Sequence, residues 1–125
     1  MFNLKNKIII VTGAGGFLGK NFCKFLISFD AMVLAIDNDN KKLNNLKKYI
    51  KKSKLNNRML HIIDCNILNE NKIKNIISKI EKKYKKIDVL INNATFRGKN
   101  MKDFYKPFEN FSLKNWSQIS RINID

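Results

Sequence analysis

Short runs of hydrophobic residues alternate along this chain with longer segments in which hydrophobic residues recur at helical spacing. A short continuous run is typical of a strand buried on both faces, whereas the longer spacing is typical of a helix with one buried side. We expect strands at residues 7–12, 31–36, 58–63 and 87–91. We expect helices at residues 16–29, 39–52 and 69–85, and a last helix that begins near Leu113.

The alternation of strands and helices predicts the α/β fold class. Helices that connect successive parallel strands cover both faces of the sheet. Right-handed crossovers in a doubly wound sheet of the Rossmann type place the strands in the order 3-2-1-4. The 125 residues suffice for one small domain, residues 1–125, and they contain no internal repeat or linker-like segment. We therefore expect a single domain whose sheet stops before the later strands of such folds.

Hydrophobic positions on one side of each expected helix are interpreted as core. In the first helix they are Phe17, Leu18, Phe22, Phe25, Leu26 and Phe29. In the next two helices they are Leu43, Leu46, Ile50, Ile73, Ile76, Ile77 and Ile80. In the last helix, after an irregular stretch with the only proline, they are Trp116, Ile119 and Ile122. Hydrophobic residues make up 44% of the sequence, which is enough for such a core.

The segment between the first strand and the first helix is rich in glycine: residues 12–19 read TGAGGFLG. Such a turn brings backbone N–H groups close to a ligand, and the positive end of the helix dipole favours phosphate there. We expect Gly13 to form the tight turn, Gly16 to let the backbone approach a pyrophosphate, and Gly19 to let helix and strand pack closely. Gly15 is an extra glycine in this pattern. Close packing alone also requires glycine, so the motif gains weight from the strand before it and the helix after it.

Acidic residues end the second and third expected strands. Asp37 can accept hydrogen bonds from the hydroxyl groups of an adenosine ribose, and it would repel the extra phosphate of NADP. The TGAGG segment contains no Lys or Arg to attract that phosphate, so NAD is favoured over NADP. A helix cap is the alternative for Asp37, although Asn38 or Asp39 could fill that role. Asp64 could touch the adenine, or it could be a solvated acid at the end of a strand.

The chain is strongly basic, with a net charge of +15. This balance raises nucleic-acid binding as an alternative, but the lysines fall mostly on expected exposed helix faces, so we expect no nucleic-acid partner. Cys23, Cys65 and His61 are too few and too scattered for a zinc site, so no metal is expected. Isolated thiols fit a reducing cytoplasm. No segment is apolar over the length of a membrane span, so we expect a cytoplasmic protein with no membrane partner.

Residues 88–95, which read DVLINNAT, make the pattern more specific. The series Thr12-Gly13-x-x-Gly16-x-x-Gly19, Asp37, Asp64 and Asn92-Asn93-Ala94 resembles the N-terminal half of the short-chain dehydrogenase/reductase family, over nearly the whole chain. The resemblance implies an NAD(P)-dependent oxidoreductase that transfers a hydride between the nicotinamide and a carbonyl or alcohol substrate. The cofactor-binding residues that it implies are Thr12, Gly13, Gly16, Phe17, Leu18, Gly19, Asp37, Asp64, Asn92, Asn93 and Ala94.

The same resemblance assigns roles toward the end of the chain. It implies that residues 92–94 steady the central sheet beside the cofactor ribose. The sequence WSQISRIN, residues 116–123, is similar to a tryptophan-to-asparagine pattern of the family, so Asn123 is implied as the catalytic asparagine that holds a water in a proton relay. An ordinary polar helix residue is the alternative. Residues 92–116 are similar to loops in short-chain reductases of bacterial surface-glycan and flagellin-glycan pathways, which implies a sugar or sugar-nucleotide substrate.

The chain also departs from the family pattern. Its glycine spacing is that of the extended branch, which leaves a sugar-nucleotide epimerase or dehydratase as an alternative, and Thr95 stands where glycine is common. The family's Tyr-x-x-x-Lys motif is absent, since the residues four positions after Tyr49, Tyr84 and Tyr105 are Ser53, Asp88 and Glu109. We therefore expect a fragment that carries the cofactor half only. A non-catalytic nucleotide-binding fragment is the second hypothesis, and a homo-oligomer is expected only for the complete enzyme.

Overall fold

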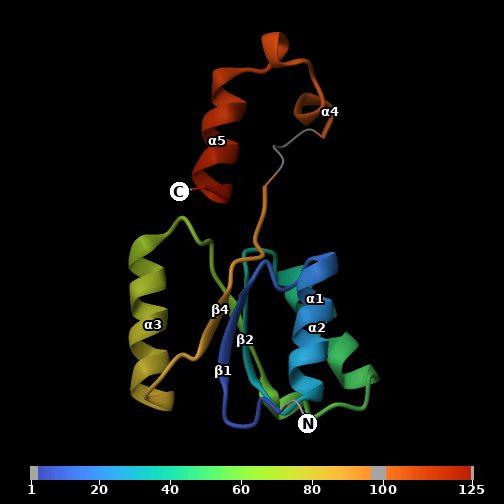
Figure 1. Cartoon of the computed structure of the whole chain (residues 1–125), viewed down its shortest axis with the longest axis vertical. Helices are drawn as coiled ribbons and strands as arrows, with labels where there is room; N and C mark the ends of the chain where they lie inside the picture. The colour runs from blue at the N-terminus through green and yellow to red at the C-terminus, as the bar shows by residue number, and fades with distance from the viewer. Residues whose placement is uncertain (1–2, 97–100, 125) are drawn as a thin grey trace. The chain divides into compact units, whose positions relative to one another are not determined.

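A computed structural model describes residues 3–96 and 101–124 of the chain. It divides into two compact units, Met1–Asn93 and Ala94–Asp125. The first unit contains a parallel sheet (Figure 1). Its strands are β1 (Ile8–Thr12), β2 (Met32–Asp37), β3 (Leu60–Asp64) and β4 (Val89–Ile91). They lie in the order β3-β2-β1-β4, so the predicted α/β fold and strand order are confirmed.

Three helices and a short 3-10 turn connect the strands of the first unit. They are α1 (Phe17–Ser28), α2 (Asn40–Lys52), η1 (Asn57–Met59) and α3 (Glu70–Tyr84). Side chains just before the helices fix where two of them begin. Asp39 accepts hydrogen bonds from the backbone N–H groups of Lys41 and Lys42, and Asn69 caps α3 in the same way. These caps satisfy backbone donors that the first helical turn leaves without partners.

The two faces of the sheet carry separate hydrophobic clusters. Alternate strand residues such as Ile9 and Val33 pack against α1 and α2, whereas their neighbours Ile8 and Leu34 pack against α3. Figure 1 shows α1 and α2 on one side of the strands and α3 on the other. This division follows from the period of two along a strand, which sends successive side chains to opposite faces.

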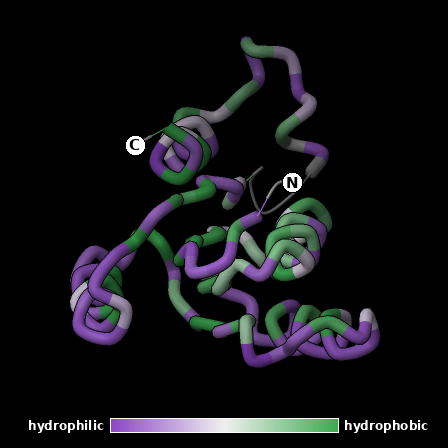
Figure 2. The backbone as a smooth tube through the Cα atoms, turned by 60° about the horizontal axis from the view of Figure 1, so that its bottom comes forward, coloured by the Kyte–Doolittle hydropathy of each residue, from purple (hydrophilic) through white to green (hydrophobic). Residues whose placement is uncertain are grey.

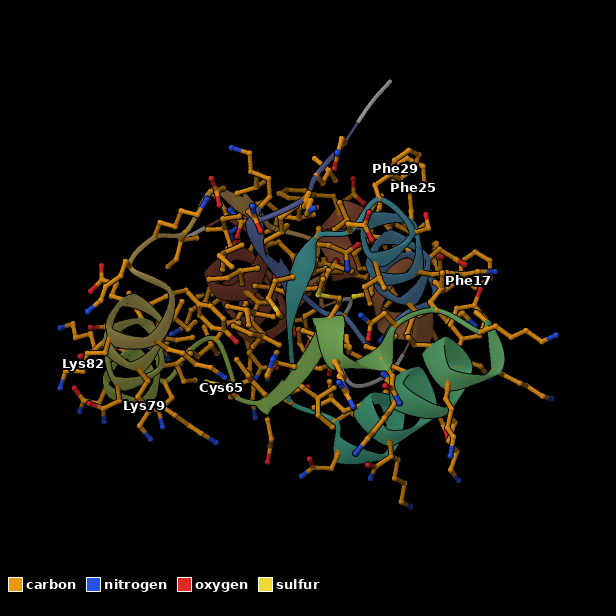
Figure 3. All side chains as sticks on the ribbon, turned by 90° about the horizontal axis from the view of Figure 1, so that it is seen from below. Phe17, Phe25, Phe29, Cys65, Lys79 and Lys82 are labelled. Atoms are coloured by element: carbon orange, nitrogen blue, oxygen red, sulfur yellow. The ribbon has the colours of Figure 1, made fainter. Side chains whose placement is uncertain are left out.

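The predicted core face of α1 is wrong for most of its residues. Leu26 is buried and Phe29 is half-buried, but Phe17, Leu18, Phe22 and Phe25 are exposed, and 76% of Phe17 is open to solvent. The buried side of the helix is instead formed by Gly19, Cys23, Leu26 and Ile27. Figure 3 shows Phe17 and Phe25 on the outer side of α1.

The rotation of α1 has a physical cause in Gly19. A Cβ at Gly19 would overlap the carbonyl oxygen of Gly13 and lie 2.7 Å from the Cα of Ala14. The helix therefore meets the preceding turn through a residue with no side chain. That approach turns the small residue Cys23, on the same helical side as Gly19, toward the sheet and the aromatic residues away from it.

The basic residues of the first unit lie where the pattern predicts. The lysines of α2 and of the end of α3 are at exposed positions. Figure 2 shows hydrophilic residues repeated around these helices between hydrophobic ones. Lys79 and Lys82 project outward from α3 in Figure 3. The positive charge is thus distributed over solvated helix faces.

Strand β4 forms one edge of the sheet and pairs with β1. Its side chains are poorly covered, since 42% of Val89 and 55% of Leu90 are exposed. An edge strand with open hydrophobic side chains is a surface that further chain can cover.

The described part of the second unit contains three helical elements. They are α4 (Met101–Phe104), η2 (Phe108–Asn110) and α5 (Leu113–Asn123). Helix α5 begins where the pattern predicts, and the hydroxyl of Ser112 accepts a hydrogen bond from the backbone N–H of Asn115 to cap it. The stretch expected to be irregular contains α4 and η2. Residues 97–100 of that stretch lie outside the described residues.

Candidate functional site

The glycine turn connects the carboxyl end of β1 to α1. Gly13 has a φ of 61°, in the left-handed region that glycine adopts at little cost. The N–H of Gly16 donates to the carbonyl of Gly13 at 3.1 Å and closes the turn. The N–H of Ala14 donates to the carbonyl of Ile36 at 3.1 Å, which ties the turn to β2. The observed conformation supports the role of Gly13 as the residue that makes the turn tight.

The start of α1 is suited to hold an anion. Its N-cap is Gly16, and no side chain caps it, in contrast to the starts of α2, α3 and α5. Phe17 and Leu18 are the first residues of the helix, and their side chains lie outside the core. Uncapped N–H groups and the positive end of the helix dipole favour phosphate at this position. A pyrophosphate therefore fits the donors that this turn presents.

Asp37 ends β2 next to the glycine turn. Its Oδ2 accepts a hydrogen bond from the N–H of Gly15 at 3.0 Å, and its Oδ1 accepts one from the N–H of Asp39 at 3.1 Å. The residue that caps α2 is Asp39, which accepts hydrogen bonds from the N–H groups of Lys41 and Lys42. The hydrogen bond from the N–H of Lys42 lowers the pKa of Asp39. The carboxylate of Asp37 is thus fixed in orientation at the end of β2, beside the glycine turn.

Asp64 lies beside Asp37, since the two residues are paired in the register of β2 and β3. It is exposed, and its Oδ2 accepts a hydrogen bond from Nδ2 of Asn40 at 2.9 Å. The next residue, Cys65, is buried, and desolvation raises the pKa of its thiol. His61 is half-buried within β3, and its ring packs edge-on against Tyr84. Cys65 and His61 are thus packed residues of the first unit.

Asn93 connects the end of β4 to the glycine turn. Its Nδ2 donates to the carbonyl oxygens of Thr12 at 3.0 Å and of Gly13 at 3.1 Å. Its backbone N–H donates to the hydroxyl of Thr12 at 3.1 Å, and that hydroxyl donates to the carbonyl of Ile91 at 3.4 Å. Asn92 is exposed, and Ala94 begins the second unit. Of the three residues implied to steady the sheet, Asn93 makes hydrogen bonds that do so.

Asn123 lies at the end of α5, within the second unit. Its Oδ1 accepts a hydrogen bond from the N–H of Phe96, and its Nδ2 donates to the carbonyl of Phe96, both at 2.9 Å. Both ends of the carboxamide are therefore engaged with one backbone residue. This geometry orients the carboxamide and ties the end of α5 to Phe96, while each end of the carboxamide keeps a further hydrogen-bonding position.

Two contributors were not identified from the sequence. Gly15 donates to Asp37 and packs against Lys42, although the glycine spacing gave it no role. Asp88 joins the starts of β1 and β4: its carboxylate accepts from the N–H of Ile8 at 2.8 Å and pairs with Lys7 and Lys86 at 3.1 Å. The hydrogen bond from Ile8, with the two lysines, lowers the pKa of Asp88 to about 2. The roles of Gly15 and Asp88 depend on contacts between segments that are far apart in the sequence, so no local sequence pattern predicts them.

The described residues contain no group of three or more potential ligands that could hold a metal ion. None of the helices described is long and apolar enough to cross a membrane. The groups around the glycine turn are backbone N–H groups, the carboxylate of Asp37 and the carboxamide of Asn93. They can hold phosphate groups and ribose hydroxyls by hydrogen bonding.

The parallel sheet, the glycine turn and the acid at the end of β2 define the dinucleotide-binding class of α/β proteins. The sequence matches the family model described as short chain dehydrogenase over residues 7–125, and the chain belongs to this family. It is 31% identical to a 3-oxoacyl-[acyl-carrier-protein] reductase of Thermotoga maritima, in an alignment that covers 73% of this chain and 36% of that protein.

Solved structures show the same fold. A protein assigned as a D-mannonate oxidoreductase of Haemophilus influenza, with bound NAD, is 25% identical and superposes with a TM-score of 0.78 over 98% of this chain and 46% of that one. A metagenomic short-chain oxidoreductase in complex with NADP has 22% identity and a TM-score of 0.78, over 96% of this chain and 51% of that one. The chain spans less than half the length of the curated relatives it matches.

Proposed function

We propose that this chain is the cofactor-binding half of an NAD(P)-dependent oxidoreductase that moves a hydride between the nicotinamide and a carbonyl or alcohol carbon. The observation that carries the proposal is the geometry around Asp37, whose carboxylate is hydrogen-bonded to the glycine turn at Gly15. One short segment thus places an anion-binding helix start beside an acceptor for hydroxyl groups. A dinucleotide presents both a pyrophosphate and ribose hydroxyls.

The residues present fit such a cofactor. The uncapped start of α1 offers N–H groups to the pyrophosphate, and Gly16 leaves this approach free of a side chain. Asp37 would accept the hydroxyls of the adenosine ribose, and Asp64, next to it in the register, would lie by the adenine. Asn93 would hold the turn in place beside the nicotinamide ribose. When bound, the nicotinamide supplies the hydride chemistry.

NAD is the proposed cofactor, with NADP the weaker ligand. The negative charge of Asp37 would face the 2′-phosphate of NADP, and repulsion between like charges lowers the affinity. The segment from Thr12 to Gly16 contains no cation to offset that repulsion. Lys42 is close to the turn, but its ammonium pairs with Asp39 at 3.7 Å. Both NAD and NADP occur among solved relatives, so the choice depends on these local charges.

The catalytic steps would need groups beyond those described. A carboxamide such as that of Asn123 does not titrate in the relevant range, so it cannot donate the proton that a reduced carbonyl needs. We propose that Asn123, oriented by its hydrogen bonds to Phe96, holds a water in a proton relay, and that another part of the complete enzyme supplies the titratable donor. The alternative, a non-catalytic nucleotide-binding fragment, has the same cofactor site. It differs from the oxidoreductase in that no such proton donor is supplied.

For the substrate we propose a sugar or a sugar-nucleotide intermediate, such as those of surface-glycan synthesis. Support comes from the similarity of residues 92–116 to loops of such reductases and from the likeness to a protein assigned as a D-mannonate oxidoreductase. The glycine spacing keeps an epimerase or dehydratase as the alternative. We propose a location in the cytoplasm, which the isolated cysteines Cys23 and Cys65 fit. We also propose a homo-oligomer for the complete enzyme.

Titration of NAD and NADP into the wild type and the Asp37→Ala variant tests the proposal. The wild type is expected to bind NAD more tightly than NADP. Asp37→Ala is expected to weaken NAD binding about tenfold, since it removes a charged hydrogen-bond acceptor, and to weaken NADP binding less. Tighter wild-type binding of NADP would contradict the assigned cofactor. Absence of binding by a folded wild type to either nucleotide would contradict the function.

A further inference from the structure

Gly15 is a glycine for reasons of space. Among the described glycines the left-handed conformation belongs to Gly13, so the backbone at Gly15 would accept another residue. A Cβ built on Gly15, however, would lie 2.5 Å from the Cβ of Lys42, 3.0 Å from the backbone carbonyl carbon of Lys42 and 3.2 Å from Oδ2 of Asp37. The two Lys42 atoms are not the movable end of a side chain. A side chain at Gly15 would therefore force the glycine turn and the start of α2 apart.

The contact between Gly15 and α2 belongs to a closed set of contacts around Asp37. One carboxylate oxygen of Asp37 accepts from the N–H of Gly15 and the other accepts from the N–H of Asp39. Asp39 in turn caps α2 by accepting from the N–H groups of Lys41 and Lys42. Asp37 is thus held by the turn on one side and by the start of α2 on the other. The two supports meet where Gly15 packs against Lys42.

We propose that Gly15 is a positioning residue that sets the preference for NAD over NADP by holding Asp37 in place. The inference rests on the proposed function, because it concerns how the site receives the adenosine ribose. Each carboxylate oxygen retains accepting capacity beyond its one backbone hydrogen bond, so Asp37 can receive ribose hydroxyls without losing its supports. A carboxylate held in this way loses little freedom on binding and keeps its charge where the 2′-phosphate of NADP would lie.

The test compares the NAD and NADP affinities of the wild type and Gly15→Ala by calorimetric titration, with circular dichroism to verify folding. We expect the dissociation constant for NAD to rise about tenfold and that for NADP to rise less, so that the preference shrinks, as loss of one charge-assisted hydrogen bond predicts. Gly16→Ala is the matched control on the same turn. Its Cβ would meet the carbonyl oxygen of Gly13 at 3.2 Å, so we expect both affinities to change by a similar factor.

Lys42 offers a rescue that a merely structural role would not predict. Lys42→Gly removes the Cβ that a side chain at Gly15 would meet, whereas Lys42→Ala removes the ammonium and keeps the Cβ. The double variant Gly15→Ala/Lys42→Gly loses the 2.5 Å overlap and keeps the longer contacts with the backbone of residue 42 and with Asp37, so it is expected to regain part of the NAD preference of Lys42→Gly alone. The double variant Gly15→Ala/Lys42→Ala is expected to show the same reduced preference for NAD over NADP as Gly15→Ala.

Each outcome decides the inference. A folded Gly15→Ala variant that keeps the wild-type ratio of affinities overturns it, and so does a folded Gly15→Ala/Lys42→Gly variant that regains none of the preference. If Gly15→Ala does not fold, Lys42→Gly is compared with Gly15→Ala/Lys42→Gly instead. Failure of that double variant to fold also overturns the inference, because space at Lys42 would then not be the cause. A folded wild type that binds neither nucleotide overturns the proposed function itself.

Discussion

The side chain of Asn93 makes two of the hydrogen bonds that join the end of β4 to the glycine turn, and its removal should be costly. Asn93→Ala deletes the two hydrogen bonds from Nδ2 to the carbonyl oxygens of Thr12 and Gly13. A buried side-chain hydrogen bond contributes about 1 kcal/mol net, and an acceptor left unpaired costs somewhat more. Thr12 is buried and Gly13 is half-buried, so water can partly replace only one of the two bonds. We expect the free energy of unfolding to fall by about 2 to 3 kcal/mol.

Urea unfolding followed by circular dichroism measures this loss. A loss of about 2 kcal/mol lowers the ratio of folded to unfolded protein roughly 30-fold, which moves the midpoint clearly. Asn92→Ala is the matched control, since the neighbouring residue has the same side chain and is exposed. It is expected to change the free energy by less than about 0.5 kcal/mol. Equal effects of the two substitutions would refute the role of Asn93 as the link between β4 and the turn.

Two further predictions concern acid stability and catalysis. Asp88 has a folded-state pKa of about 2 against a usual value of 3.8, so its stabilisation should be present above about pH 4 and disappear as the pH falls to 2. Asp88→Asn should flatten that part of a plot of unfolding free energy against pH; an unchanged slope would contradict the assignment. Residues 1–125 alone should be poorly soluble or loosely folded and show no NAD(H)-dependent turnover, and a C-terminal half should restore order and activity. A monodisperse, active monomer would contradict this. The titrations and unfolding measurements use the complete enzyme if residues 1–125 alone do not fold.

The sequence was sufficient to predict the order of elements and the sheet topology. Uninterrupted hydrophobic runs, such as residues 8–11, and helical spacing in between are local signals. Handedness rules then restrict the strand order. The tight turn at Gly13 and the acid at Asp37 could also be predicted from the sequence. A glycine turn after a strand and an acid at the end of the next strand have recognisable positions.

The rotation of α1 and the role of Gly15 could not be read from the pattern. Phe17 and Phe25 have helical spacing and were assigned to the core, but the close approach of Gly19 to the turn determines which side of the helix faces the sheet. Gly15 is adjacent to Lys42 only after β2 and α2 have returned to the turn. Such contacts depend on the distance between two backbones, and hydrophobic periodicity carries no information about that distance.

An NMR titration with NAD is the most direct test of dinucleotide binding at the glycine turn. It records the backbone amide signals of the folded protein as NAD is added. The signals of Gly13, Gly15, Gly16 and Asp37 are expected to shift in a saturable way, because these groups surround the proposed pyrophosphate and ribose positions. A folded Gly13→Val variant should lose these shifts, since a branched residue cannot easily adopt the φ of 61°. Saturable shifts confined to other parts of the chain, or unaltered NAD binding by folded Gly13→Val, would contradict the account.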